Sequence, residues 1–180
     1  LKPAENQNVS PFMERINKHT SFKGFRPLPD LAAAFLRQYP AGFQDAQYLK
    51  DERDYKVAAS NFFHENLGQE AFSGLLEMGD HQGLVKPALP LIGKTNLVFP
   101  NEVMALKDGL AANERQVEFS RRLYALLHGD MSDAFDGFID LLVEMKACKW
   151  TIATYFPFLL SPSEHIFVKP TITQKAAEAF

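Results

Sequence analysis

Apolar residues recur at intervals of three and four along most of the chain, and this spacing predicts α-helices. The longest example is residues 45–67, where Tyr48, Tyr55, Ala59 and Phe63 follow the spacing. The same pattern predicts shorter helices at 11–19, 31–39, 71–77, 113–128 and 132–148, and a last helix that begins near Thr171. We therefore expect a mainly α fold: a single compact helical domain of about seven to eight helices, with at most a small β element.

Residues 79–100 interrupt this pattern with repeated glycines and prolines. Both residue types favour turns and loops over helix interiors. We therefore predict an irregular connecting segment over 79–100. Two short runs rich in apolar, β-branched or aromatic residues, 97–99 and 166–168, are where a small extended element is expected.

Two helical segments resemble each other, AFSGLLE at 71–77 and AFDGFID at 134–140. Each has a glycine two residues after a phenylalanine, where glycine costs a helix about 1 kcal/mol relative to alanine. Close contacts with neighbouring helices would explain Gly74 and Gly137. Because the flanking residues do not agree, we interpret the match as chance and not as an internal duplication.

The end of the chain is strongly apolar. From Trp150 to Leu160 no residue carries a charge, but a membrane-spanning helix needs about 20 such residues. We therefore interpret this run as core, with no membrane segment. Because the chain starts at Leu1 and stops within a helical pattern, we interpret residues 1–180 as one domain that is a piece of a longer chain.

The composition is that of an ordinary globular protein, with 46% hydrophobic and 23% charged residues. Cys148 is the only cysteine, so no internal disulfide can form, and we expect a reducing, cytoplasmic location. The zinc-protease spacing requires a second histidine one helical turn after the first, and none follows His64 and Glu65. We predict neither a metal nor a cofactor, and we identify no catalytic residue.

Residues 88–95, ALPLIGKT, are similar to a relaxed phosphate-binding loop in which alanine replaces the first glycine. Such a loop surrounds phosphate with successive backbone N–H groups at the start of a helix. Pro90 removes one of these donors, and the residues after Thr95 do not resemble a helix. We therefore expect that Lys94 does not bind a nucleotide.

A basic stretch with interleaved aromatic residues lies at 15–27, and no acidic residue occurs between Glu14 and Asp30. Positive charge and aromatic rings together can neutralise phosphates and stack on unpaired bases. The alternative is that the phenylalanines pack under a neighbouring helix while the basic side chains remain in water. The net charge of −3 favours this alternative. The candidate nucleic-acid or anion site comprises Arg15, Lys18, Phe22, Lys23, Phe25 and Arg26.

The densest charge cluster is DERDYK at 51–56. Glu52 and Lys56 are spaced to form an ion pair along a helix, so a solvated helix face is one interpretation. The other is that Glu52, Arg53, Tyr55 and Lys56 line a polar cleft, where they could orient an anionic or polar ligand. The sequence leaves both interpretations open.

Two functional hypotheses follow. The first is a non-catalytic intracellular binding module that holds a protein or nucleic-acid partner. The alternative is an enzyme of unknown reaction with its polar cleft near Glu52, Arg53, Tyr55 and Lys56. A deep pocket with convergent polar groups would favour the enzyme, and an exposed apolar patch would favour the module.

Overall fold

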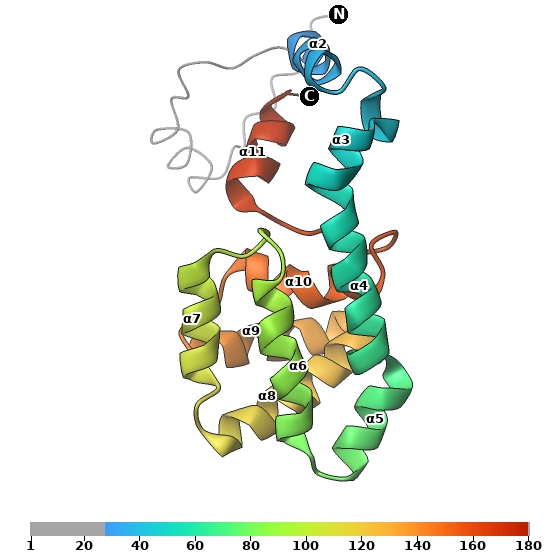
Figure 1. Cartoon of the computed structure of the whole chain (residues 1–180). Coiled ribbons are helices and arrows are strands. Elements are labelled where there is room, and N and C mark those ends of the chain that lie inside the picture. Colours follow the sequence, from blue (N-terminus) through green and yellow to red (C-terminus); the bar gives the residue numbers. More distant parts are fainter. Residues whose placement is uncertain (1–27, 180) are drawn as a thin grey trace, which may run out of the picture.

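The computed structural model describes residues 28–179, which form helices joined by short loops (Figure 1). This confirms the predicted mainly α fold, and residues 28–179 contain no β-strand. A 3₁₀ turn, η1 (Gly42–Gln44), precedes α3, and a π-helical segment, η2 (Leu49–Arg53), joins α3 to α4. In chain order the α-helices are α2 (Leu28–Gln38), α3 (Ala46–Tyr48), α4 (Asp54–Leu67), α5 (Gln69–Glu77), α6 (His81–Gly93), α7 (Pro100–Gly109), α8 (Asn113–His128), α9 (Met131–Glu144), α10 (Trp150–Leu160) and α11 (Pro170–Ala179).

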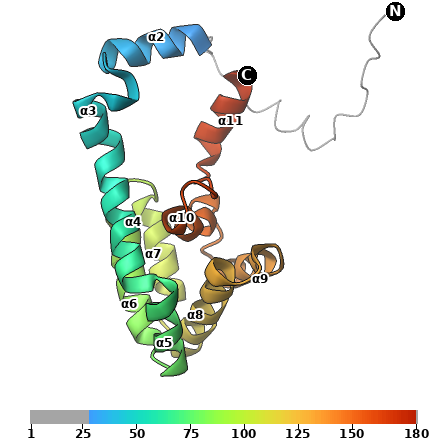
Figure 2. The same ribbon diagram turned by 90° about the vertical axis from the view of Figure 1, so that its right-hand side faces the viewer.

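Helices α4 to α10 pack into one body around a shared hydrophobic core. Its largest fully buried side chains are mostly aromatic: Phe63, Phe72, Phe119, Phe138, Tyr155 and Phe156. Helices α2 and α11 lie beyond one end of this body (Figures 1 and 2). Helix α2 has no buried residue, so its apolar side chains contribute nothing to that core.

The apolar run near the end of the chain forms α10, which packs against α4, α8 and α9. Ile152, Tyr155, Phe156 and Leu159 are buried there, which confirms the interpretation of this run as core. No helix within residues 28–179 has both the length and the apolar character needed to cross a membrane. The later residue Ile166 is exposed, so the core does not extend over the whole tail.

The prediction of an irregular segment over 79–100 is wrong for residues 81–93, because these form α6. The Asp80 carboxylate caps this helix by accepting a hydrogen bond from Gly83 N at 2.8 Å. Proline in a helix interior costs about 3 kcal/mol, and α6 contains two, Pro87 and Pro90. Burial offsets this cost at roughly 1.5 to 3 kcal/mol for each large apolar side chain. The buried side chains of α6 recur at helical spacing: Leu84, Val85, Ala88, Leu91 and Ile92.

The two runs expected to be extended, 97–99 and 166–168, lie outside helices but pair with no strand. Val98 is buried in the core, and Val168 N donates a hydrogen bond to Thr154 Oγ1 of α10 at 3.0 Å. Both segments are therefore held by the helices next to them.

Gly74 and Gly137, the glycines of the two similar segments, differ in their surroundings. A Cβ added at Gly74 would meet no atom within 4 Å, so the predicted close contact is wrong there. A Cβ added at Gly137 would lie 2.5 Å from Nη1 of Arg122, and this Nη1 donates a 2.8 Å hydrogen bond to Gly137 O. Gly137 thus allows the α8 side chain to reach the backbone of α9.

Candidate binding cleft

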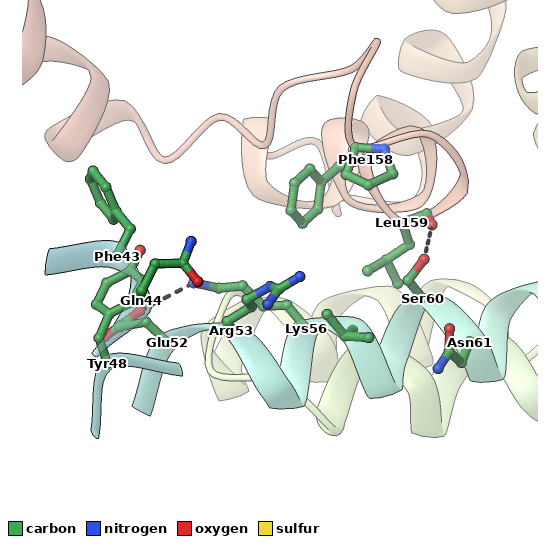
Figure 3. A pocket seen from close by; sticks show the side chains of 12 residues that line it. Phe43, Gln44, Tyr48, Glu52, Arg53, Lys56, Ser60, Asn61, Phe158 and Leu159 are labelled. Carbon is green, nitrogen blue, oxygen red and sulfur yellow. Dashed lines mark hydrogen bonds and ion pairs between the residues drawn. The ribbon is translucent and has the colours of Figure 1, made fainter. Parts of the chain in front are cut away.

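A cleft of about 790 Å³ lies between the α3–η2–α4 helix and the C-terminal end of α10. Its wall contains three of the four residues proposed from the sequence, Glu52, Arg53 and Lys56 (Figure 3). The opposite side is formed by the end of α10 and the turn after it, with Phe158 and Leu159. We call this space the α4–α10 cleft.

The cleft-lining residues of α4 and its start share one helix face. Arg53, Lys56, Val57, Ser60 and Asn61 have the spacing i, i+3, i+4, i+7 and i+8, which places side chains on one side of a helix. Arg53 is the last residue of η2, which has the wider i→i+5 hydrogen-bonding of a π-helix, closed by Asp54 N to Leu49 O. Such π segments within α-helices occur often at functional sites.

Two of the charged groups in the cleft neutralise each other. Lys56 Nζ lies 3.1 Å from Glu52 Oε2 and 5.1 Å from the Tyr55 ring centroid. Partial burial lowers the pKa of Lys56, but its interactions with Glu52 and Tyr55 outweigh that effect, so the pKa is raised overall. Lys56 therefore stays protonated, and its charge is largely balanced by Glu52.

Arg53 leaves the cleft with one positive charge in excess. Its side chain is exposed and forms no ion pair or hydrogen bond with any residue of the described range 28–179. In Figure 3 the guanidinium extends into the space beneath Phe158. A guanidinium presents several N–H donors in a plane, which suits a carboxylate or a phosphate.

Tyr55 does not line the cleft, so the prediction for this residue is wrong. It lies on another side of α4, where its hydroxyl donates a 2.7 Å hydrogen bond to Asn96 Oδ1 in the loop after α6. Tyr55 and Lys56 follow Glu52 by three and four residues, so they lie on two adjacent faces of the helix. The sequence pattern alone does not distinguish between them.

The aromatic part of the cleft was not found from the sequence. Phe43, Tyr48 and Phe158 line it, and Phe43 is 67% exposed. The Tyr48 ring also contacts Phe35 and Phe43, with centroids 5.5 and 5.4 Å apart. Proximity to the charged cluster would have suggested Tyr48, whereas Phe158 is contributed by tertiary packing from a distant part of the chain.

The polar groups of the cleft are not arranged as a nucleophile and its base. Ser60 Oγ donates a 2.7 Å hydrogen bond to the backbone oxygen of Leu159, and Glu52 is paired with Lys56. Neither histidine nor cysteine is present in the lining. Elsewhere in the part of the chain that the structure describes, no group of three potential metal ligands is found. The cleft therefore has groups for holding a ligand, with aromatic rings on its walls and a guanidinium free to bind an anion.

The proposed basic site lies outside the described residues: Arg15, Lys18, Phe22, Lys23, Phe25 and Arg26. The charges of the remaining chain are nevertheless known. Residues 28–180 carry 14 basic and 20 acidic side chains. A net negative charge disfavours the approach of a polyanion, so the helical body itself is poorly suited to bind nucleic acid.

The segment similar to a phosphate-binding loop ends a helix instead of preceding one. Residues 88–93 belong to the C-terminal part of α6, and Lys94 is its C-cap. Lys94 Nζ lies 3.8 Å from the centroid of the Phe62 ring, which is a cation–π contact. The negative end of the helix dipole is at this terminus, which is unfavourable for phosphate.

Comparisons with known proteins do not supply a family: no protein-family model, curated protein or solved structure matches the chain.

Proposed function

We propose that the protein is a non-catalytic binding module that holds an acidic segment of a partner protein in the α4–α10 cleft. The observation that carries the proposal is the unpaired guanidinium of Arg53 among aromatic side chains. An aspartate or glutamate of the partner would pair with Arg53, and a neighbouring apolar side chain would pack on Phe43 and Phe158.

The surface around the cleft supports a peptide as the ligand. Phe43 contacts Phe35 of α2 with ring centroids 4.9 Å apart, and a Cβ added at the neighbouring Gly42 would lie 3.8 Å from Cδ2 of Leu36. Leu31 and Leu36 of α2 are exposed. An apolar surface therefore continues from the cleft onto α2, and an exposed apolar surface of this kind is typical of a protein-interaction site.

The charge distribution supports a protein partner over nucleic acid. The cleft carries one excess positive charge, whereas residues 28–180 have six more acidic than basic side chains, 20 against 14. A single guanidinium in a negative body can bind an isolated carboxylate. A chain of phosphates would be repelled by the net negative charge of residues 28–180.

Selection from a random-peptide library tests the proposal. The wild-type protein is the target, and the Arg53→Ala variant is the counter-target used to remove peptides that bind elsewhere. We expect the enriched peptides to carry aspartate or glutamate beside an aromatic or aliphatic residue. Arg121→Ala is the matched control, since Arg121 is exposed on α8 and does not line the cleft.

A selection in which no peptide remains after removal of those that bind Arg53→Ala would contradict the proposal, as would enrichment of basic peptides. The nucleic-acid hypothesis has a separate test, a titration with single-stranded oligonucleotide at low salt. Binding that is lost in Lys23→Ala and Arg26→Ala would favour nucleic acid as the partner.

A further inference from the structure

A second cavity, of about 500 Å³, lies at the other end of α10 from the α4–α10 cleft. It is bordered by α9, by the N-terminal turn of α10 and by the first residues of α7 and α11. Two aromatic and two acidic residues give it its character: Phe135, Trp150, Glu102 and Asp136. We call it the Trp150 groove.

The aromatic part of the groove is unusually open to solvent. Trp150 is 55% exposed although it begins a helix that is otherwise mostly buried. The Phe135 ring is stacked near it, with centroids 6.5 Å apart and planes inclined by 25°. Burying a tryptophan is among the larger gains available to a core. An indole that is stacked near one ring and has more than half of its surface in water is suited to contact with a ligand.

Glu102 is held in a fixed position beside this indole. Its Oε2 accepts hydrogen bonds from Phe99 N at 3.1 Å and from the Thr151 hydroxyl at 2.9 Å. Both bonds use the same oxygen, and no hydrogen bond with a residue in 28–179 engages Oε1. The carboxylate is thus oriented by the protein and retains an oxygen for a ligand.

Asp136 supplies a second carboxylate one residue after Phe135. It is exposed, and it forms no ion pair or hydrogen bond with the residues that the structure describes. Among the residues that line the groove, Lys149 is the one with a positive charge, so the lining has an excess of one negative charge. The positive end of the α10 helix dipole is at this N-terminus and disfavours a cation in the groove. The negative charge of Glu102, which accepts a hydrogen bond from Thr151 at that terminus, offsets this effect.

We propose that the Trp150 groove binds an arginine side chain of a basic peptide segment in a partner protein. A guanidinium is planar, so it can stack on the indole of Trp150 while its N–H groups donate to Asp136 and Glu102. A lysine ammonium has no flat face and cannot form such a two-carboxylate fork in the plane of the ring. This site is separate from the α4–α10 cleft and does not depend on what the cleft binds.

The chain provides its own probe, because Trp150 is the only tryptophan in the sequence. Its fluorescence can be followed during titration with a short synthetic oligoarginine peptide. We expect a saturable change in emission. The matched peptide in which citrulline replaces arginine keeps the shape of the side chain but has no charge, and it should produce no saturable change.

Two variants locate the binding. Asp136→Asn removes a charge-assisted hydrogen bond of about 1.5–3 kcal/mol, so the affinity should fall by roughly 10- to 100-fold. Asp133→Asn is the matched control, because Asp133 is exposed on the same helix and does not line the groove. It should lower the affinity only slightly.

Glu102→Gln provides a second test that preserves the fold, because a glutamine oxygen can still accept from Phe99 N and Thr151. It should weaken binding while leaving the melting temperature nearly unchanged. The proposal is overturned if the citrulline peptide binds as the arginine peptide does, or if Asp136→Asn and Asp133→Asn lose affinity equally. An oligolysine peptide that binds as tightly as oligoarginine would overturn the assignment of a guanidinium.

Discussion

Replacing Tyr155 with phenylalanine removes a hydroxyl that connects α10 to the end of α6. Tyr155 is fully buried, and its hydroxyl donates a 2.8 Å hydrogen bond to Leu91 O. Thr95 Oγ1 lies 3.0 Å from the same hydroxyl oxygen. Since the single phenolic proton is given to Leu91 O, the Thr95 hydroxyl is the donor in the second bond. Without the Tyr155 hydroxyl, Leu91 O would still accept a hydrogen bond from Lys94 N at 3.1 Å. The Thr95 side chain, in contrast, is buried.

The expected cost follows from which group is left without a partner. In Tyr155→Phe the buried Thr95 hydroxyl is orphaned, which should lower the free energy of unfolding by about 1–3 kcal/mol. Thr95→Val removes the donor and leaves no buried group without a partner, so the free energy of unfolding should fall by about 0.5–1.5 kcal/mol. In the Thr95→Val background, Tyr155→Phe should cost less than it does in wild type.

Urea unfolding followed by circular dichroism measures these free energies, and the four proteins form a double-mutant cycle. The reasoning is refuted if Tyr155→Phe is as stable as wild type, or if it costs the same with and without Thr95.

High pH gives a second measurement on the same proteins. Burial raises the pKa of Tyr155 to about 12, against 10.0 for a free tyrosine, although the Thr95 hydrogen bond lowers it. The unfolded state therefore ionises first, and stability should fall as pH rises from 10 to 12, by less in Tyr155→Phe.

Three further changes have defined outcomes. Gly74→Ala should raise the free energy of unfolding by about 0.5–1 kcal/mol, because the new methyl group meets no other atom. Gly137→Ala should give a smaller gain or a loss, because its methyl group displaces Arg122. Equal shifts in the melting temperature would contradict this. Burial lowers the pKa of His128, although a hydrogen bond to Leu67 raises it, so stability should fall as pH decreases through 6.5, and His128→Leu should lose this dependence in acid titrations. A fragment ending at Cys148 lacks α10 and should aggregate in size-exclusion chromatography; a monomeric fragment that melts cooperatively would show that α10 is dispensable.

Local patterns in the sequence were enough to predict most of the helical fold. Helical spacing located α4, α8 and α9, because each presents a regular apolar face to the core. It failed at α6, where Pro87 and Pro90 suggested a loop. The cost of two prolines is local, but the burial that offsets it depends on neighbouring helices, and these cannot be read from the segment itself.

The candidate cleft was predicted only where its residues are close in sequence. Glu52, Arg53 and Lys56 lie within two turns of one helix, so their proximity followed from helix geometry. Phe158 joins them only because α10 packs on α4. The exposure of Trp150 was also unexpected, since the apolar run that it begins predicted burial and the residues after it are indeed buried.

The central claim is that Arg53 pairs with a carboxylate of a partner segment, and a calorimetric double-mutant cycle tests it most directly. An acidic peptide selected on the wild-type protein and its aspartate-to-asparagine counterpart are titrated into wild type, Arg53→Ala and Arg121→Ala. We expect Arg53→Ala and the asparagine peptide each to lower the affinity by about 10- to 100-fold, as for one charge-assisted bond. Together they should lose no more than either alone, with Arg121→Ala near wild type. Losses that add independently, or an Arg53→Ala variant that binds as tightly as wild type, would contradict the proposed function.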